Sequence, residues 1–553
     1  MRRAVAISFA LALACACTKN QPNDKTSPDR PSTTMLDYIP ADSPFVLVSP
    51  EPLPRAITDW IGLGLASTLD ALQSQIAEKR TGTTDRLNRA VMAELDGRLS
   101  RAGMESLGFT LEPRFAIYTI GLSLAVRVEV ADGAKVAALL DRIEQNSGQA
   151  LPMASLLGVT YRQFVKDDMA VVAAVIGNEL VFGLMHQNAR KQVLPVLFGK
   201  TRPARTLADT GVLRQYRDKY QLLGVGLGYI DVPAILAMVM GTASPLSQEI
   251  IKDSGLTLPP LSPACKSELN ELAATVPRLV FGYQDLAPTL IRALVAIELR
   301  KDLADDLARQ QAPVLDLQAL ANNQPLFAMG MNTDLGKLMA FARSKVAKLV
   351  AAPYRCEHFN SVNERMAELQ EAMNKPWPPF LAGFKAFALS VNDIQMNGYP
   401  PNGSGYLAIA MDDAMAGFRA LADAWPQLHQ INLVPDGKPA SVSLGVPGMN
   451  TLDVAATKNR LVFTFGAGMQ ERVSALLASK PGADTPAIMI AYDYARFMQL
   501  ASFAVSMYGP DLAVMTALGN ILGYMRAELR FSTNGILTTF TMEPRTTEPQ
   551  QAR

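Results

Sequence analysis

Apolar and polar residues alternate along this chain with two different periods, and each period predicts one kind of element. Residues 125–130 (AVRVEV) alternate with period two, which is typical of a strand with one face in water. Val136, Leu139, Leu140 and Ile143 recur at helical spacing. Strands joined in hairpins, with helices between them, predict an α+β fold of antiparallel sheet with the helices packed mainly on one face.

The same order of predicted elements occurs twice, over residues 36–300 and 323–545. Each stretch begins with a strand and two helices, continues with a hairpin and a helix, and closes with two long strands. The closest match is a strand containing Leu-Val-Phe, at 178–185 and again at 459–465. The chain is therefore predicted to contain two tandem, pseudo-symmetric modules with a seam between them, joined by a connecting helix or linker at 301–322.

Local patterns predict further elements. Helices are predicted over 51–70 and 84–103, and Asn402–Gly405 predicts a hairpin turn because Asn and Gly favour turn conformations. Residues 233–241 and 511–524 are unusually apolar helical stretches in a chain with 25 methionines. They fit core packing, or else a soft apolar surface or pocket for a lipid, an acyl chain or a hydrophobic peptide, or a short membrane-contacting patch.

The first residues have the pattern of a secretory signal. Two arginines precede an apolar run, Ala4–Ala14, which is too short to span the ~30 Å core of a membrane. Small residues then precede Cys15 and Cys17, in an arrangement that resembles the bacterial lipobox. We expect Cys17 to be the acylated residue, with Cys15 as the alternative, because a polar stretch begins directly after Cys17. An ordinary cleaved signal with incidental cysteines is the other interpretation.

These features predict a signal peptide at 1–16 and a flexible, proline-containing tether at 17–35, while a disordered tail is predicted at 546–553. By the lipobox resemblance, the cysteine would be diacylated and N-acylated. Its chains would hold the protein on a membrane almost irreversibly, since each buried methylene contributes roughly 0.8 kcal/mol. Because Lys19 is not an inner-membrane retention residue in lipoproteins, the resemblance implies an outer-membrane lipoprotein that faces the periplasm.

Two cysteines remain for the body of the protein, Cys265 and Cys356. In an oxidising periplasm they are predicted to form one disulfide that holds the two modules together, with two separate buried thiols as the alternative. Cys356-Glu357-His358 suggests a metal or nucleophile site, but adjacent residues do not converge on one ion. The sequence has no zinc, calcium or Cys-x-x-Cys spacing, so no metal and no cofactor is predicted.

Composition narrows the functional classes. The 553 residues include 52 basic and 51 acidic ones, and this balance offers no basic surface for nucleic acid. With three histidines and no Gly-x-Ser-x-Gly or Ser-x-x-Lys motif, no catalytic residue is predicted. We therefore expect a non-enzymatic binding or scaffold lipoprotein for a hydrophobic ligand or an envelope protein partner. The alternatives are a structural component of an envelope complex without a small ligand, and a hydrolase with scattered site residues.

Residues 36–45 (LDYIPADSPF) carry a family resemblance. They are similar to the opening of uncharacterised bacterial envelope lipoproteins, in which a Pro-Ala-Asp-Thr-Pro phrase introduces the first strand of a repeated α+β domain of unknown function. The resemblance covers this phrase and the general order of elements. It implies an extracytoplasmic location and a similar fold, and it implies no activity and no site residue.

Overall fold

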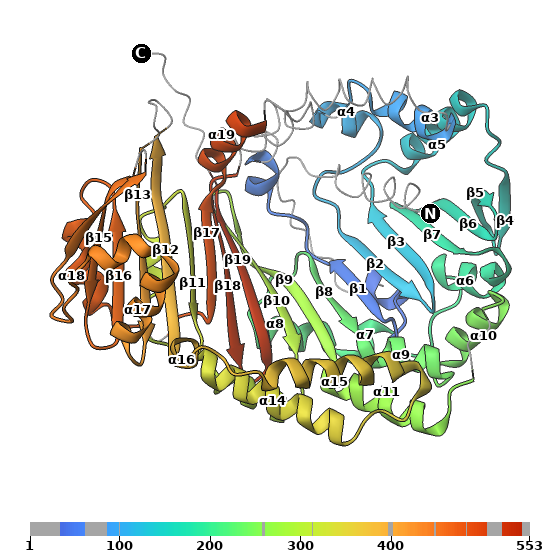
Figure 1. Ribbon diagram of the computed structural model, residues 1–553. Coiled ribbons are helices and arrows are strands. Elements are labelled where there is room, and N and C mark those ends of the chain that lie inside the picture. Colours follow the sequence, from blue (N-terminus) through green and yellow to red (C-terminus); the bar gives the residue numbers. More distant parts are fainter. Residues whose placement is uncertain are drawn as a thin grey trace, which may run out of the picture.

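The computed structural model describes residues 34–60, 86–98, 100–256, 260–311, 313–395, 402–446, 449–482, 484–505 and 522–544. Within these ranges, 19 strands form one continuous antiparallel sheet, which confirms the α+β class (Figure 1). The strands are β1 (Phe45–Ser49), β2 (Phe115–Ile120), β3 (Ser123–Glu129), β4 (Met153–Leu156), β5 (Val159–Lys166), β6 (Met169–Ile176), β7 (Glu179–His186), β8 (Leu227–Asp231), β9 (Arg278–Ala287), β10 (Leu290–Glu298), β11 (Phe327–Asn332), β12 (Phe384–Gln395), β13 (Asn402–Met411), β14 (Ala440–Val446), β15 (Met449–Ala456), β16 (Arg460–Phe465), β17 (Ile488–Asp493), β18 (Tyr524–Ser532) and β19 (Gly535–Glu543).

Hydrogen-bonded neighbours follow one another across the sheet in the order β4–β5–β6–β7–β3–β2–β1–β8–β9–β10–β19–β18–β17–β11–β12–β13–β16–β15–β14. Strands β1 to β10 therefore form one half of the sheet, and β11 to β19 form the other. The two halves join where β10 pairs with β19, from Ile291 opposite Met542 to Glu298 opposite Gly535. The edge strands are β4 and β14.

Helices connect the strands and surround the sheet. The α-helices are α3 (Arg86–Leu95), α4 (Arg101–Ser106), α5 (Gly133–Ser147), α6 (Arg190–Leu197), α7 (Leu207–Thr210), α8 (Val212–Tyr220), α9 (Val232–Met240), α10 (Pro245–Asp253), α11 (Pro263–Thr275), α12 (Lys301–Ala308), α13 (Gln318–Ala321), α14 (Leu335–Ala351), α15 (Asn360–Asn374), α16 (Pro379–Ala382), α17 (Ala414–Ala424), α18 (Val473–Ala478) and α19 (Tyr494–Val505). Short 3-10 helices are η1 (Met35–Tyr38), η2 (Gln187–Ala189), η3 (Glu357–Phe359), η4 (Pro426–Gln430) and η5 (Gln470–Arg472). Residues 55–60 are also helical, within the predicted helix 51–70.

The cross-strand register divides the side chains between two faces that continue from strand to strand. Val46 of β1 lies opposite Tyr118 of β2 and Tyr229 of β8, and all three side chains are buried. Leu47, the next residue of β1, lies on the reverse side opposite Ile117, where both side chains are only partly buried. We call the first side the helix-covered face and the second the open face.

Helices pack on both faces. On the helix-covered face, α6 and α8 contribute to the largest core cluster. α12 contacts β18 and β19. On the open face, α5 packs through Val136 and Leu139 beside β6 and β7, and α17 packs through Phe418 beside β13 and β16. The prediction that helices lie mainly on one face is therefore wrong at these two ends of the sheet. The segment 301–322 also packs closely, since Leu317 is fully buried in a core cluster.

The predicted helix over 84–103 is interrupted. α3 ends at Leu95, and α4 begins only at Arg101. Gly97 between them has φ +72°, a left-handed conformation that glycine adopts at helix ends without steric cost. Ser100 then caps α4 by accepting a hydrogen bond from the backbone N–H of Gly103. Helical periodicity alone missed these stop and start signals.

The predicted turn at Asn402–Gly405 is wrong. These residues begin β13 and pair with β12, with Gly405 opposite Val391. A Cβ at position 405 would lie 2.3 Å from the carbonyl oxygen of Ser390 and 2.7 Å from the ring of Phe465. The glycine therefore allows close packing inside the sheet and does not form a turn.

The alternation at 125–130 is present, but its sides are reversed. Arg127 points to the helix-covered face, where it is 1% exposed, while its valine neighbours lie on the open face. It pairs with Glu179, and it donates a hydrogen bond of 2.8 Å to the carbonyl oxygen of Leu197, the last residue of α6. Its guanidinium carbon lies 4.0 Å from the ring centroid of Tyr38. These partners offset the free-energy cost of burying the guanidinium, which would be large for an unpaired charge.

Candidate functional site

Six strands at the centre of the sheet present a continuous apolar surface on the open face. They are β8, β9, β10, β19, β18 and β17. The register joins its members across the strands, so that Val295 of β10 lies opposite Phe281 of β9 and Thr538 of β19. We call this surface the central apolar face. It consists of Ile230, Leu279, Phe281, Tyr283, Leu286, Ile291, Ala293, Val295, Ile297, Ile488, Ile490, Tyr492, Met525, Ala527, Leu529, Phe531, Ile536, Thr538, Phe540 and Met542.

None of these side chains is fully buried. Phe540 is 48% exposed, Ile490 is 41% exposed and Ile488 is 36% exposed, and the others are partly buried. The surface continues onto β1 at one side and onto β11 at the other, through Phe45 and Phe327. Contiguous apolar surfaces of this kind mark sites where a soluble protein meets a ligand, a partner or a membrane.

The charged residues of the same six strands all lie on the helix-covered face. On β18, for example, Arg526 and Glu528 alternate with Met525 and Ala527 of the central apolar face. The complete set is Asp231, Arg278, Asp285, Arg292, Glu298, Asp493, Arg526, Glu528, Arg530 and Glu543. A one-sided sheet usually covers its apolar face and leaves its polar face in water. At the centre of this sheet both faces are partly accessible: Glu298 and Glu528 are buried on the charged face, Asp285 and Arg292 are 44% and 38% exposed there, and the apolar face is partly exposed as well.

Ion pairs and hydrogen bonds offset the burial of these charges. The Glu528 side chain is 6% exposed and lies 3.2 Å from Arg526 Nε and 2.7 Å from an Arg530 guanidinium nitrogen. Glu298 accepts a hydrogen bond of 2.7 Å from the Tyr220 hydroxyl. Burial, and then this bond to Glu298, raise the pKa of Tyr220. The covered charges therefore have partners within the protein.

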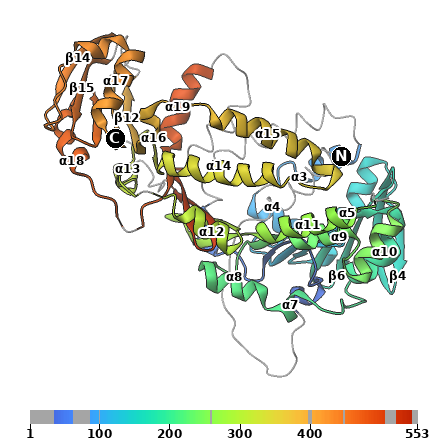
Figure 2. The ribbon, with the colours of Figure 1, turned by 60° about the horizontal axis from the view of Figure 1, so that its bottom comes forward.

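A helical hairpin crosses one end of the central strands. α14 and α15 pack side by side and run from α16 toward α11 (Figure 2), and we call this pair the helical strap. Asp334 caps α14 by accepting a 2.9 Å hydrogen bond from the backbone N–H of Lys337, and it also accepts one of 2.8 Å from Lys385 Nζ. Burial alone would raise the pKa of Asp334, but these hydrogen bonds outweigh it and hold the pKa below its ordinary value.

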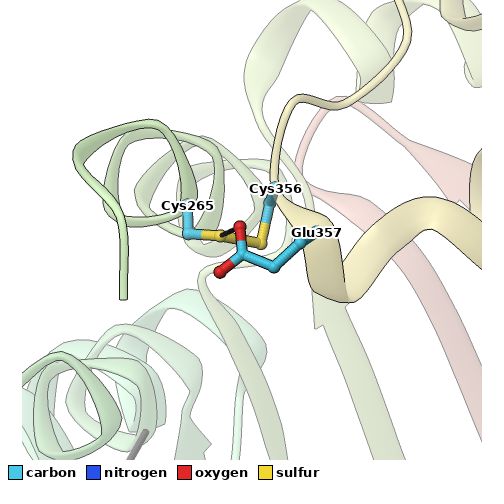
Figure 3. A group of neighbouring side chains, drawn as sticks. All are labelled: Cys265, Cys356 and Glu357. Atoms are coloured by element: carbon cyan, nitrogen blue, oxygen red, sulfur yellow. Dashed lines mark hydrogen bonds between the residues drawn. A yellow bond between two sulfur atoms is a disulfide. The ribbon is translucent and has the colours of Figure 1, made fainter. Parts of the chain in front are cut away.

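A disulfide joins the far end of the strap to the first half of the chain. Cys356 follows α14 and is bonded to Cys265 of α11, with the two Cα atoms 4.4 Å apart (Figure 3). Both residues are buried. The Glu268 carboxylate of α11 accepts hydrogen bonds from the backbone N–H groups of Arg355 and Cys356, at 2.8 and 3.0 Å. The predicted cysteine pair thus joins the two halves of the chain, and Glu268 adds hydrogen bonds between the same two segments.

Glu357 lies beside the disulfide. One of its carboxylate oxygens is 3.3 Å from Cys265 Sγ, and these two residues and Cys356 form a compact group (Figure 3). Because both sulfurs are bonded to each other, neither is a thiolate that could ligate a metal. His358 Nε2 is 3.8 Å from the other Glu357 oxygen and does not join the group. His186 is remote from it and caps η2.

Several sequence predictions fall outside the described residues. These are the signal peptide with Cys15 and Cys17, nearly all of the tether, the tail, and most of the stretch 511–524; Tyr524, its last residue, begins β18. The other apolar stretch forms α9. Within the described ranges no single helix is long and apolar enough to cross a membrane, and α9 passes that test only jointly with α10, at a bend of 58°.

Sequence reasoning missed the central apolar face, although a local signal for it existed. Residues 524–531 (YMRAELRF) alternate charged with apolar side chains, which predicts a strand with two distinct faces. The alternation does not show which face another element covers. That depends on tertiary contacts such as the one between β18 and α12, which lies far from β18 along the chain.

Comparisons with known proteins leave the site to be interpreted from its own geometry. No family model matches the chain, and no curated protein and no solved structure matches it.

Proposed function

We propose that the protein is a membrane-anchored, non-enzymatic binding lipoprotein that holds a hydrophobic ligand on the central apolar face. The observation that carries this proposal is the uncharged apolar face of the six central strands, on which Phe540, Ile490 and Ile488 are exposed while every charged residue of these strands lies on the opposite face. Fully burying a Phe or Ile side chain contributes about 1.5–3 kcal/mol relative to leaving it in water. An occupant that covers Phe540, Ile488 and Ile490 would therefore gain most of its affinity from these exposed residues.

The two halves of the chain are, in this proposal, the pseudo-symmetric modules that the sequence predicts. The strand order supports them, because β7–β3–β2–β1–β8–β9–β10 in the first half corresponds to β16–β13–β12–β11–β17–β18–β19 in the second. Asp132 and Asp413 cap the corresponding helices α5 and α17. Asp231 and Asp493 likewise cap α9 and α19. The central apolar face then spans the seam and takes equivalent strands from both modules.

A lipid anchor at Cys17, or alternatively at Cys15, would keep this face close to a membrane. A polar tether of about 17 residues has an r.m.s. reach of roughly 20–25 Å. The ligand site would then work beside the periplasmic surface of the outer membrane, the location that the lipobox resemblance implies. Binding and positioning need no catalytic group, which agrees with the lack of catalytic motifs in the sequence.

Nile red binding to the unacylated full chain, with Cys15→Ser and Cys17→Ser, tests the proposal. We expect saturable fluorescence, and Ile490→Lys should weaken binding tenfold or more because the ligand would desolvate an unpaired charge. Val434 is the matched control, since it is 51% exposed and lies outside the central apolar face. Val434→Lys should bind like the parent protein. Equal binding by both variants contradicts the proposal, and no binding by the parent favours a structural component without a ligand.

A further inference from the structure

We infer that the occupant of the central apolar face is the acyl-chain part of a lipid, lying across the strands with its polar head outside the face. The inference rests on the proposed function and specifies the chemical class of the ligand.

The central apolar face offers no charge and few hydrogen-bonding groups. Its polar side-chain atoms, among the residues that define it, are the hydroxyls of Tyr283, Tyr492 and Thr538. Protein interfaces usually have about one hydrogen bond per 100–200 Å². A charged ligand group would be desolvated here without a partner. A methylene chain needs neither hydrogen bonds nor a counter-charge, and it matches this surface.

The backbone of the six central strands has no free edge for a peptide. Each of these strands is hydrogen-bonded to a neighbour on both sides, and the edges of the sheet, β4 and β14, lie at its two far ends. A peptide strand can add to a sheet only at such an edge. Laid on this face, it would bury amide groups without partners at a cost of about 2–7 kcal/mol each.

The length of the apolar surface suits long hydrocarbon chains. From Phe45 on β1 to Phe327 on β11 it crosses eight adjacent strands. At a strand spacing of about 4.8 Å these strands span roughly 34 Å. This exceeds the ~30 Å hydrocarbon thickness of a bilayer. Since α5 and α17 cover the open face beyond the centre, the accessible row has two closed ends.

Photocrosslinking with a diazirine derivative of palmitate, on the unacylated full chain, tests the inference. We expect crosslinks in peptides that contain β9, β10, β18 or β19, and we expect oleate to compete for them. Phe540→Lys should reduce crosslinking tenfold or more, and Val434→Lys should leave it unchanged. Ile490→Lys, on a different strand, must give the same loss as Phe540→Lys if the face itself binds the chain.

The two proposals fail in different ways. If Nile red binding depends on Ile490 but palmitate crosslinks lie elsewhere or are absent, the acyl-chain assignment is overturned and the proposed function stands. Failure of both probes overturns both proposals. Organic extraction of freshly purified protein is an independent check: lipid recovered from the parent and from Val434→Lys, but not from Phe540→Lys, supports the inference. A bound amphipathic peptide recovered instead overturns it.

Discussion

Phe540 of β19 lies directly opposite Ala293 of β10, on the open face of the strand pair where the two halves of the chain meet. One residue further along the same strands, Thr541 lies opposite Arg292 on the helix-covered face. Adjacent positions thus carry an exposed aromatic ring on one face and, on the other, a charge that is paired with Asp285. A register shift of one residue on either strand would exchange the two faces. The pairing of β10 with β19 therefore keeps the apolar side of the seam accessible.

The disulfide between Cys265 and Cys356 is expected to stabilise the fold by fixing the strap to α11. The bond closes a loop with a sequence separation of 91 residues. The loop-entropy relation gives roughly 4–5 kcal/mol as an upper bound for the loss in the Cys265→Ser/Cys356→Ser variant. Urea unfolding of the parent and the variant measures this loss. Peptide mapping without reductant should show the two cysteines linked, and two free thiols would refute the bond.

Arg127 is expected to be essential for stability although it lies far from the proposed ligand site. Arg127→Leu leaves Glu179 without its guanidinium and Leu197 without its donor, so we expect a loss of about 3–5 kcal/mol in the free energy of unfolding. Arg114→Leu is the control, because Arg114 pairs with Glu129 at the surface and should lose about 1 kcal/mol or less. Similar losses in the two variants would show that burial of Arg127 has no special role.

Asp334 gives the strap a dependence on pH. Its pKa is lowered in the folded state, because bonds from Lys385 and the Lys337 backbone outweigh the effect of burial. A carboxyl with a lowered folded-state pKa stabilises the fold fully above its unfolded-state pKa of about 3.9. That stability is lost as the pH falls through the lower, folded-state value.

Lys385→Met should therefore lower stability at neutral pH and make its decline below pH ~4 shallower. Urea midpoints measured across this pH range test the expectation. Lys438→Met is the control, since Lys438 is exposed and lies 3.7 Å from Asp436. An acid profile of Lys385→Met that parallels the parent profile would rule out this linkage.

Acylation at the N-terminus is expected to depend on one cysteine. Metabolic labelling with palmitate should be abolished by Cys17→Ser and retained by Cys15→Ser, because the polar tether begins directly after Cys17. The opposite pattern would move the acceptor to Cys15. Labelling that survives loss of both cysteines, or that never occurs in the parent, would contradict the lipoprotein proposal.

Local sequence patterns were sufficient to predict individual elements and the two surfaces that each strand could present. Period-two alternation at 125–130 predicted the strand that the structure has as β3, and the helical spacing of Val136, Leu139 and Ile143 predicted α5. These features depend on interactions among near neighbours in the chain. Where local signals competed, as at Gly97 and at Gly405, periodicity and composition gave wrong boundaries.

Which face of each strand is buried depends on long-range packing, which local patterns do not contain. Arg127 has the same alternating pattern as a solvent-facing residue, yet it is buried because Glu179 and the end of α6 meet it there. Likewise, Glu528 of β18 is buried beside Arg526 and Arg530, whereas Phe540 of the neighbouring β19 is 48% exposed on the opposite face. Alternation defines two faces without showing which of them is buried. That depends on elements distant in sequence, and in this protein they leave apolar side chains of the central strands accessible.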